Sequence, residues 1–225
     1  MKQSFDLAIN NLYKQFCQKE NLITVLKGIT YLFCQEKSYA IMGASGTGKS
    51  TLMHILAGLD SPSQGTVNLG CDNIAQYSTQ KRAEQIAFVV QSPTLIKELS
   101  VIENIGLSGV LAGQSWGKSL ENADNLLDKV GLSSLGRYNV GQLSGGQKQR
   151  AALARALMNK PKFLLTDELT GNLDHQTSLA IMNFVLDLKK EWDFGLIIST
   201  HNYEIAALMD EQLVLKDGLL VKQSS

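Results

Sequence analysis

Residues 43–51 read Gly43-Ala44-Ser45-Gly46-Thr47-Gly48-Lys49-Ser50-Thr51. This glycine-rich segment directly follows the apolar residues 39–42 and directly precedes a helical pattern over 52–57. Its glycines let consecutive backbone N–H groups surround a phosphate, and the helix that follows directs the positive end of its dipole at the same anion. The segment has the form of a phosphate-binding P-loop, and we predict that residues 43–51 contact a nucleoside triphosphate.

Two side chains of the P-loop have specific expected roles. The ammonium group of Lys49 should reach the β- and γ-phosphate oxygens, and the hydroxyl group of Ser50 should ligate Mg²⁺. A GTPase would in addition need an Asn-Lys-x-Asp motif to specify guanine. The nearest match, residues 159–162, reads Asn-Lys-Pro-Lys and lacks the aspartate, which argues against a GTPase.

Length and composition narrow the class of protein. The chain has 225 residues, 44% of them hydrophobic and 19% charged, so it can bury one good core or two unequal lobes. Its formal net charge is zero and its Lys and Arg residues are scattered, which predicts no nucleic-acid partner. Three widely spaced cysteines without a CxxC pair indicate reduced thiols in a cytosolic protein. No segment approaches the roughly 18 continuous apolar residues of a membrane span, so we expect membrane contact only through a partner.

The rest of the chain predicts an α/β fold. Short apolar stretches at 22–26 and 29–33 suit antiparallel strands. Apolar residues between 120 and 130 recur at helical spacing, which indicates a helical insertion over 92–141. From residue 163 onward strands alternate with helices, as in a parallel sheet with right-handed crossovers. We therefore predict one domain over 1–225, with a RecA-like P-loop core and an N-terminal antiparallel β subdomain in 1–91 and 142–225.

A second segment with expected chemistry ends the strand that begins at Phe163. The apolar run 163–166 is followed by two adjacent carboxylates, Asp167 and Glu168. Ligands of parallel sheets bind at the carboxyl ends of strands. Asp167 is therefore expected to hold Mg²⁺ beside the P-loop, and Glu168 is expected to face the attacking water.

A third segment, Leu143-Ser144-Gly145-Gly146-Gln147, precedes a strong helix-forming run. The two glycines expose the N-terminus of that helix, which makes a second anion site. A single nucleotide bound within one chain does not explain two phosphate sites separated by a helical insertion. Residues 143–147 resemble the LSGGQ signature of the ABC ATPase family, and the resemblance extends over nearly the whole chain.

The resemblance implies a set of functional residues. Phe16 matches the aromatic residue that stacks on adenine, and Gln91 matches the Q-loop glutamine that touches Mg²⁺ or the water. Residues 171–174 match the D-loop, and His201 matches the switch histidine that contacts the γ-phosphate. The implied catalytic set is Glu168, His201, Gln91 and Lys49; the metal set is Ser50, Gln91 and Asp167; and the signature contacts to ATP come from Ser144, Gly145, Gly146 and Gln147.

The resemblance also implies an assembly. Two copies bind head to tail, and each Mg²⁺-bound ATP lies between the P-loop of one copy and the signature of the other. Transmembrane permease subunits hold this dimer on the cytoplasmic face of the inner membrane. The stretches 58–65 and 170–174 are most similar to a subgroup with lipoprotein-releasing, macrolide-exporting and cell-division ATPases, which implies a motor for lipoprotein release or export.

Two alternatives stay open within the family. A regulatory ABC ATPase of the cell-division type moves no substrate, and a soluble ABC ATPase acts on ribosomes or DNA. The more important of two departures from the family pattern is Leu169, which stands where Asp-Glu-Pro-Thr has its proline; the milder one is Lys97, where the subgroup often has proline. Leucine restricts the backbone less than proline does, so we expect a looser turn after Glu168.

Overall fold

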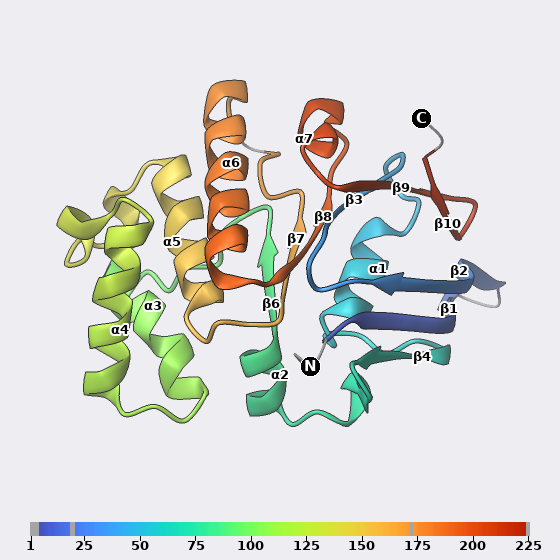
Figure 1. Ribbon diagram of the computed structural model, residues 1–225, viewed down its shortest axis with the longest axis horizontal. Helices are drawn as coiled ribbons and strands as arrows, with labels where there is room; N and C mark the ends of the chain where they lie inside the picture. The colour runs from blue at the N-terminus through green and yellow to red at the C-terminus, as the bar shows by residue number, and fades with distance from the viewer. Residues whose placement is uncertain (1–4, 19–20, 172, 224–225) are drawn as a thin grey trace.

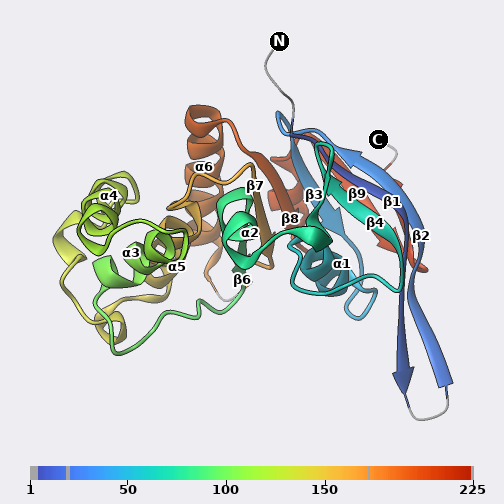
Figure 2. The same ribbon diagram turned by 90° about the horizontal axis from the view of Figure 1, so that it is seen from below.

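The computed structural model describes residues 5–18, 21–171 and 173–223, and its elements form stacked layers (Figures 1 and 2). A small antiparallel sheet packs over helix α1 (Lys49–Leu56), and α1 packs on one face of a larger, mostly parallel sheet. The helices of the other layer cover the opposite face of that sheet. Each face therefore has its own apolar core, and the predicted α/β class is confirmed.

The larger sheet has the strand order β10-β9-β3-β8-β7-β6. The strands β9, β3, β8, β7 and β6 are parallel to one another, and β10 pairs antiparallel with β9 at the edge of the sheet. The central strands are continuous apolar runs because both of their faces are buried. The bounds are β3 (Ser38–Met42), β6 (Ile86–Val90), β7 (Phe163–Asp167), β8 (Gly195–Ser199), β9 (Glu211–Lys216) and β10 (Leu219–Lys222).

The antiparallel sheet has the order β2-β1-β4-β5, and its β1–β2 hairpin extends beyond the body of the molecule (Figure 2). The stretches 22–26 and 29–33, expected as separate short strands, both lie within the single long strand β2. The reason is a bulge, since Gly28 has φ +76° and the pairing register with β1 shifts around it. The bounds are β1 (Leu7–Gln18), β2 (Asn21–Phe33), β4 (Gln64–Leu69) and β5 (Asp72–Asn73).

The second helical layer takes two of its helices from residues 92–141, the segment for which the sequence predicts a helical insertion. Helix α4 (Trp116–Lys129) covers most of the segment whose apolar spacing predicted a helix, and it packs on α3 (Val101–Leu111). Helix α5 (Gly145–Leu157) contacts α3 and α4 on one side and β6 and α6 on the other. The remaining helices are α2 (Thr79–Gln85), α6 (His175–Trp192) and α7 (Tyr203–Ala207).

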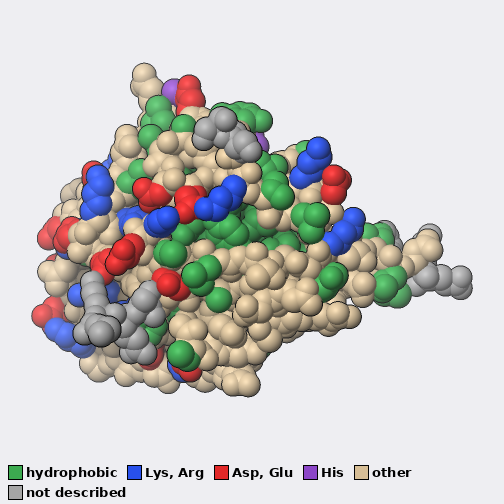
Figure 3. Space-filling model, turned by 45° about the vertical axis from the view of Figure 1, so that its right-hand side comes forward, with side chains coloured by type: hydrophobic (Ala, Val, Ile, Leu, Met, Phe, Trp, Pro, Cys, Tyr) green, Lys and Arg blue, Asp and Glu red, His purple; other side chains and the backbone are tan. Residues whose placement is uncertain are grey.

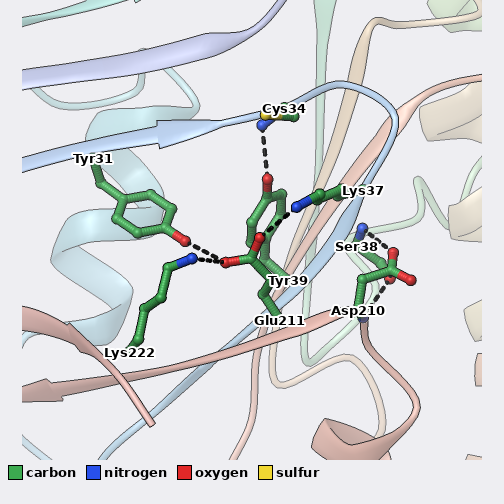
Figure 4. Close-up of polar contacts among 8 residues, drawn as sticks. All are labelled: Tyr31, Cys34, Lys37, Ser38, Tyr39, Asp210, Glu211 and Lys222. Carbon is green, nitrogen blue, oxygen red and sulfur yellow. Dashed lines mark hydrogen bonds and ion pairs between the residues drawn. The ribbon is translucent and has the colours of Figure 1, made fainter. Parts of the chain in front are cut away.

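A charged network at the start of β9 joins the two sheets (Figure 4). The carboxylate of Glu211 on β9 accepts hydrogen bonds from Tyr31 on β2 at 2.9 Å, Lys37 at 2.7 Å and Lys222 on β10 at 2.6 Å. On the visible surface of Figure 3, Lys and Arg side chains are interspersed with Asp and Glu side chains. Among the described helices, none combines the length and apolar character needed to cross a bilayer.

Candidate nucleotide site

The carboxyl ends of four adjacent parallel strands bring most of the expected site residues to one edge of the sheet. The P-loop follows β3, and His201 comes two residues after β8. Asp167 ends β7, and Gln91 directly follows β6. In the register of the sheet, Asp167 pairs with Val90 on one side and with Ser199 on the other. Residues from four separate parts of the sequence therefore converge at this edge.

The P-loop has the backbone that its glycines predict. Gly46 and Gly48 have φ of +79° and +101°, conformations that residues with a Cβ rarely adopt. A Cβ at Gly48 would lie 2.5 Å from Cγ1 of Val25 on β2, so only glycine lets the hairpin pack this close. A Cβ at Gly46 would have nothing within 4 Å, so this part of the loop is open. The loop thus forms a cradle with one open side.

The N-terminus of α1 and the ammonium group of Lys49 provide positive charge in this cradle. Gly48 caps α1 and offers no side chain to its first N–H groups, which a phosphate could accept from. Lys49 is only 7% exposed, and its Nζ donates to the carbonyl oxygens of Gly43 at 2.8 Å and Ala44 at 2.9 Å. These contacts hold the ammonium group against the loop. The structure therefore fits a polyphosphate.

The expected metal ligands are few. Ser50 lies in the first turn of α1, which contacts β7, and Oδ1 of Asp167 accepts a hydrogen bond from the hydroxyl of Ser199. Within residues 5–18, 21–171 and 173–223, no cluster of three or more His, Cys, Asp or Glu side chains could hold a metal ion. This donor set suits Mg²⁺, which proteins commonly bind through one or two ligands together with the phosphates of its nucleotide.

Glu168 and His201 form the second part of the site. Oε1 of Glu168 lies 3.4 Å from Nδ1 of His201, and both residues line a polar cavity of about 210 Å³. The carboxylate of Glu168 is 30% exposed and the imidazole of His201 is 68% exposed. Both groups are therefore accessible to a nucleotide and to water.

Gln91 lies against the turn that follows β7. A Cβ at Gly171 would come within 2.6 Å of Nε2 of Gln91, so the Gln91 side chain packs closely on the backbone of this turn. Gly171 begins the expected D-loop, of which Asn172 lies outside the described residues. The predicted Q-loop and D-loop thus contact each other beside Glu168.

Phe16 lies on β1 opposite Ile23 of β2, two residues before the Val25 that covers Gly48. Phe16 is 42% exposed, and Nζ of Lys14 lies 5.0 Å from the centroid of its ring. Phe16 is therefore outside the apolar core, on the hairpin that packs over the P-loop. An adenine-stacking role stays a prediction.

The signature residues lie on the other face of the sheet from α1. Ser144 caps α5, and Ser144 and Gln147 exchange the two hydrogen bonds of a capping box. A Cβ at Gly145 would contact Leu173, and a Cβ at Gly146 would contact Thr177. The signature end of α5 therefore packs beside the D-loop, whereas the P-loop leads into a helix on the opposite face.

The turn formed by residues 168–171 is not loose, contrary to the expectation from Leu169. Glu168 donates its N–H to the carbonyl oxygen of Ser199 at 3.1 Å, and its own carbonyl oxygen accepts from Gly171 N at 2.9 Å. The side chain of Leu169 is buried in the helical core, with the residue 4% exposed. Burial of Leu169 and the two backbone hydrogen bonds therefore hold this turn, which the proline of the family pattern would restrict.

Three long-range side-chain contacts, two at the site and one in a neighbouring groove, could not be predicted from the sequence. The hydroxyl of Ser199 holds Asp167, and the side-chain amide of Gln149 donates to Leu169 O at 2.7 Å. The third is Arg155, which lines a groove of about 420 Å³ between β6, α3 and α5 and donates to Thr94 O at 2.8 Å. None of these residues stands in a motif that marks its role, because each acts through a contact distant in the sequence.

Comparison with known proteins identifies this arrangement. A family model described as "ABC transporter" matches residues 26–171, well over half of the chain. The chain belongs to the ABC transporter family. The resemblance seen in the signature is therefore confirmed, and the chain is an ABC ATPase.

Relatives and solved structures agree with this ABC assignment. The chain is 40% identical over 223 residues to the lipoprotein-releasing system ATP-binding protein LolD of Acinetobacter baylyi, covering 97% of this chain and 98% of the relative. It is 38% identical to LolD of Legionella pneumophila strain Lens, covering 95% and 96%. A dimeric post-hydrolysis structure of the ATP-binding cassette MJ0796 bound to ADP and Pi has a TM-score of 0.86 at 30% identity, with 97% and 99% coverage.

Proposed function

We propose that two copies of this chain bind two molecules of Mg²⁺-bound ATP between them. Lys49, Ser50 and Asp167 of one copy bind each nucleotide on one side, and the signature residues Ser144–Gly146 of the other copy bind it on the other side. The position of the two phosphate sites on opposite faces of the sheet carries this proposal, because one chain cannot close both around one nucleotide. A dimer provides the missing half of each site, and the MJ0796 cassette was solved as a dimer.

In this composite site Glu168 orients and deprotonates the attacking water. Lys49, His201 and the signature N–H groups of the other copy stabilise the charge that develops on the γ-phosphate, and Gln91 completes the Mg²⁺ and water contacts. The contact between Glu168 and His201 supports these roles, since it places the base and a γ-phosphate ligand side by side. Phe16 adds adenine stacking from the hairpin.

We further propose that this dimer, held by permease subunits on the cytoplasmic face of the inner membrane, hydrolyses ATP to power lipoprotein release. The LolD relatives, which are named for lipoprotein release and cover nearly the whole chain, support this substrate. The permease subunits dock in the groove lined by Leu59, Leu111 and Arg155. Leu59 and Leu111 are 54% and 66% exposed, although both are apolar. Burial of their side chains against a permease would stabilise the complex. Burial also lowers the pKa of Arg155, which lines the same groove.

Reconstitution tests this function directly. The purified chain and a candidate permease from the same organism are placed in vesicles that carry a lipid-linked protein, and release of that protein into solution is followed after ATP is added. We expect release that requires ATP and the permease, and none when the Glu168→Gln variant replaces the parent. ATP hydrolysis without release would assign the chain to the regulatory type. Hydrolysis stimulated by ribosomes or DNA would assign it to the soluble type.

A further inference from the structure

The structure assigns Gln149 as a positioning residue that holds the backbone of Glu168 through the carbonyl group of Leu169. Gln149 lies on α5, five residues after Ser144, and is only 2% exposed. Its Nε2 donates to the carbonyl oxygen of Leu169 at 2.7 Å inside the protein. The inference rests on the proposed role of Glu168 as the base.

The backbone of Glu168 needs such support. Its φ of +50° lies in the left-handed region, which is unfavourable for a residue with a Cβ. A residue keeps this conformation only where the surrounding structure holds it. The N–H and C=O groups of Glu168 are bonded to Ser199 and Gly171, and the next carbonyl group along the chain is bonded to Gln149. Of these three hydrogen bonds, the one with Gln149 comes from α5 in the helical layer.

The contact also links the two ATP sites of the proposed dimer. Helix α5 carries Ser144 at its N-terminus, and Gln149 follows about 7.5 Å further along the axis at 1.5 Å per residue. A movement of the signature end is therefore transmitted to the turn that carries Glu168 of the same chain. Because the signature contacts the nucleotide of the other copy, this hydrogen bond connects one ATP site to the base of the second.

Loss of the donor should affect turnover more than binding. Without the amide, the buried carbonyl oxygen of Leu169 loses its partner and the turn relaxes away from its present conformation. Glu168 then moves relative to the attacking water, and a misplacement of about 1 Å can cost about 100-fold in rate. The P-loop lies on the opposite face of the sheet, so ATP affinity should stay unchanged.

The test compares Gln149→Met, which keeps the length of the side chain and removes the donor, with the parent. We expect kcat of phosphate release to fall by about 10- to 100-fold while KM and the Kd for ATP stay within about twofold. Gln149→Asn, which keeps an amide that is one methylene too short to reach Leu169, should behave in the same way. Leu157→Val at the far end of α5 is the control, since it loosens the packing of the same helix without touching the turn.

A double-mutant cycle separates positioning from a general loss of stability. In a Glu168→Gln background, Gln149→Met should change the residual rate by less than about twofold, because both substitutions act through the same group. Equal kcat for Gln149→Met and the parent would overturn the inference. It would also be overturned if Leu157→Val, at a melting temperature similar to that of Gln149→Met, lost as much kcat. A parent-like rate for Glu168→Gln alone would instead refute the proposed base, and the positioning role with it.

Discussion

The carboxylate of Glu168 and the imidazole of His201 meet at 3.4 Å, although the two residues lie 33 positions apart in the sequence. They are brought together because β7 and β8 are parallel neighbours whose carboxyl ends share one edge of the sheet. Asp167, directly before Glu168, is held by the hydroxyl of Ser199 on the neighbouring strand. Adjacent carboxylates thus have different partners, which supports a metal role for Asp167 and a base role for Glu168.

Glu168→Gln should keep ATP binding and slow hydrolysis by roughly 10²- to 10⁴-fold, the usual contribution of a positioned general base. The amide keeps the shape of the side chain but cannot accept a proton from water. Phosphate release at saturating ATP measures the loss, and size-exclusion chromatography should show a dimer that retains ATP. Glu98→Gln, at an exposed site in the segment before α3, is the control and should hydrolyse ATP as the parent does.

The composite site predicts opposite effects for two substitutions. Ser144→Arg should abolish hydrolysis but leave ATP binding by the monomer intact, because the P-loop of the same chain is unchanged. Lys49→Ala should weaken binding itself. Titration of each monomer with a fluorescent ATP analogue measures binding, and phosphate release measures turnover.

The control for Ser144→Arg is Ser115→Arg, which removes the equivalent N-cap from α4. Both substitutions should cost about 0.5–2 kcal/mol of stability through the lost cap, so only Ser144→Arg should stop hydrolysis. The dimer model is wrong if Ser144→Arg weakens nucleotide binding by the monomer as much as Lys49→Ala does.

Local sequence patterns predicted the parts of the site that consist of one short segment. The P-loop could be located because its glycines, lysine and serine stand at fixed spacing between a strand and a helix. Asp167 and Glu168 could be located because they end an apolar strand. Gln91, His201 and Phe16 have no such local pattern, and their interpretation depended on the resemblance to a family.

Contacts between distant segments could not be predicted in this way. Gln149 lies in an ordinary helix-forming run, and nothing in that run indicates that its amide reaches Leu169. The single long strand β2 was likewise missed, since Gly28 interrupts its apolar pattern while the bulge lets the strand continue. Leucine in place of proline at position 169 suggested a looser turn. The burial that holds the Leu169 side chain could not be predicted, because it depends on the packing of the whole helical layer.

The groove between β6, α3 and α5 predicts where a permease contacts the chain. Leu111→Glu places a charge on its exposed rim, so the complex with the permease should weaken by about tenfold or more. Hydrolysis by the isolated chain should stay within about twofold of the parent, because Leu111 lies outside the nucleotide site. Affinity copurification and permease-stimulated phosphate release measure the two effects.

Leu32→Glu is the matched control for the groove, since Leu32 is 52% exposed on β2 and does not line the groove. It should bind the permease as the parent does. Equal loss of permease binding in both variants would show that added negative charge, and not the groove, is responsible.

The Glu211 network predicts a pH-dependent contribution to stability. Hydrogen bonds from Lys222 and Lys37 lower the pKa of Glu211 from its ordinary value of 4.5 to about 2. Because the folded protein favours the charged carboxylate, the stabilisation is complete above pH 4.5 and is lost as the pH falls toward 2. Glu211→Gln should therefore lower the free energy of unfolding at pH 7 by about 1–2 kcal/mol, limited by the exposure of both lysines.

Urea unfolding of the parent and Glu211→Gln across the pH range gives the measurement. The difference between the two proteins should be constant from pH 7 down to the ordinary pKa of the carboxyl group and should shrink below it. Glu121→Gln is the control, because the pair of Glu121 with Lys118 is exposed on one helix and should contribute little. A difference that persists unchanged in acid would mean that Glu211 acts through packing between the two sheets, and that its charge contributes nothing.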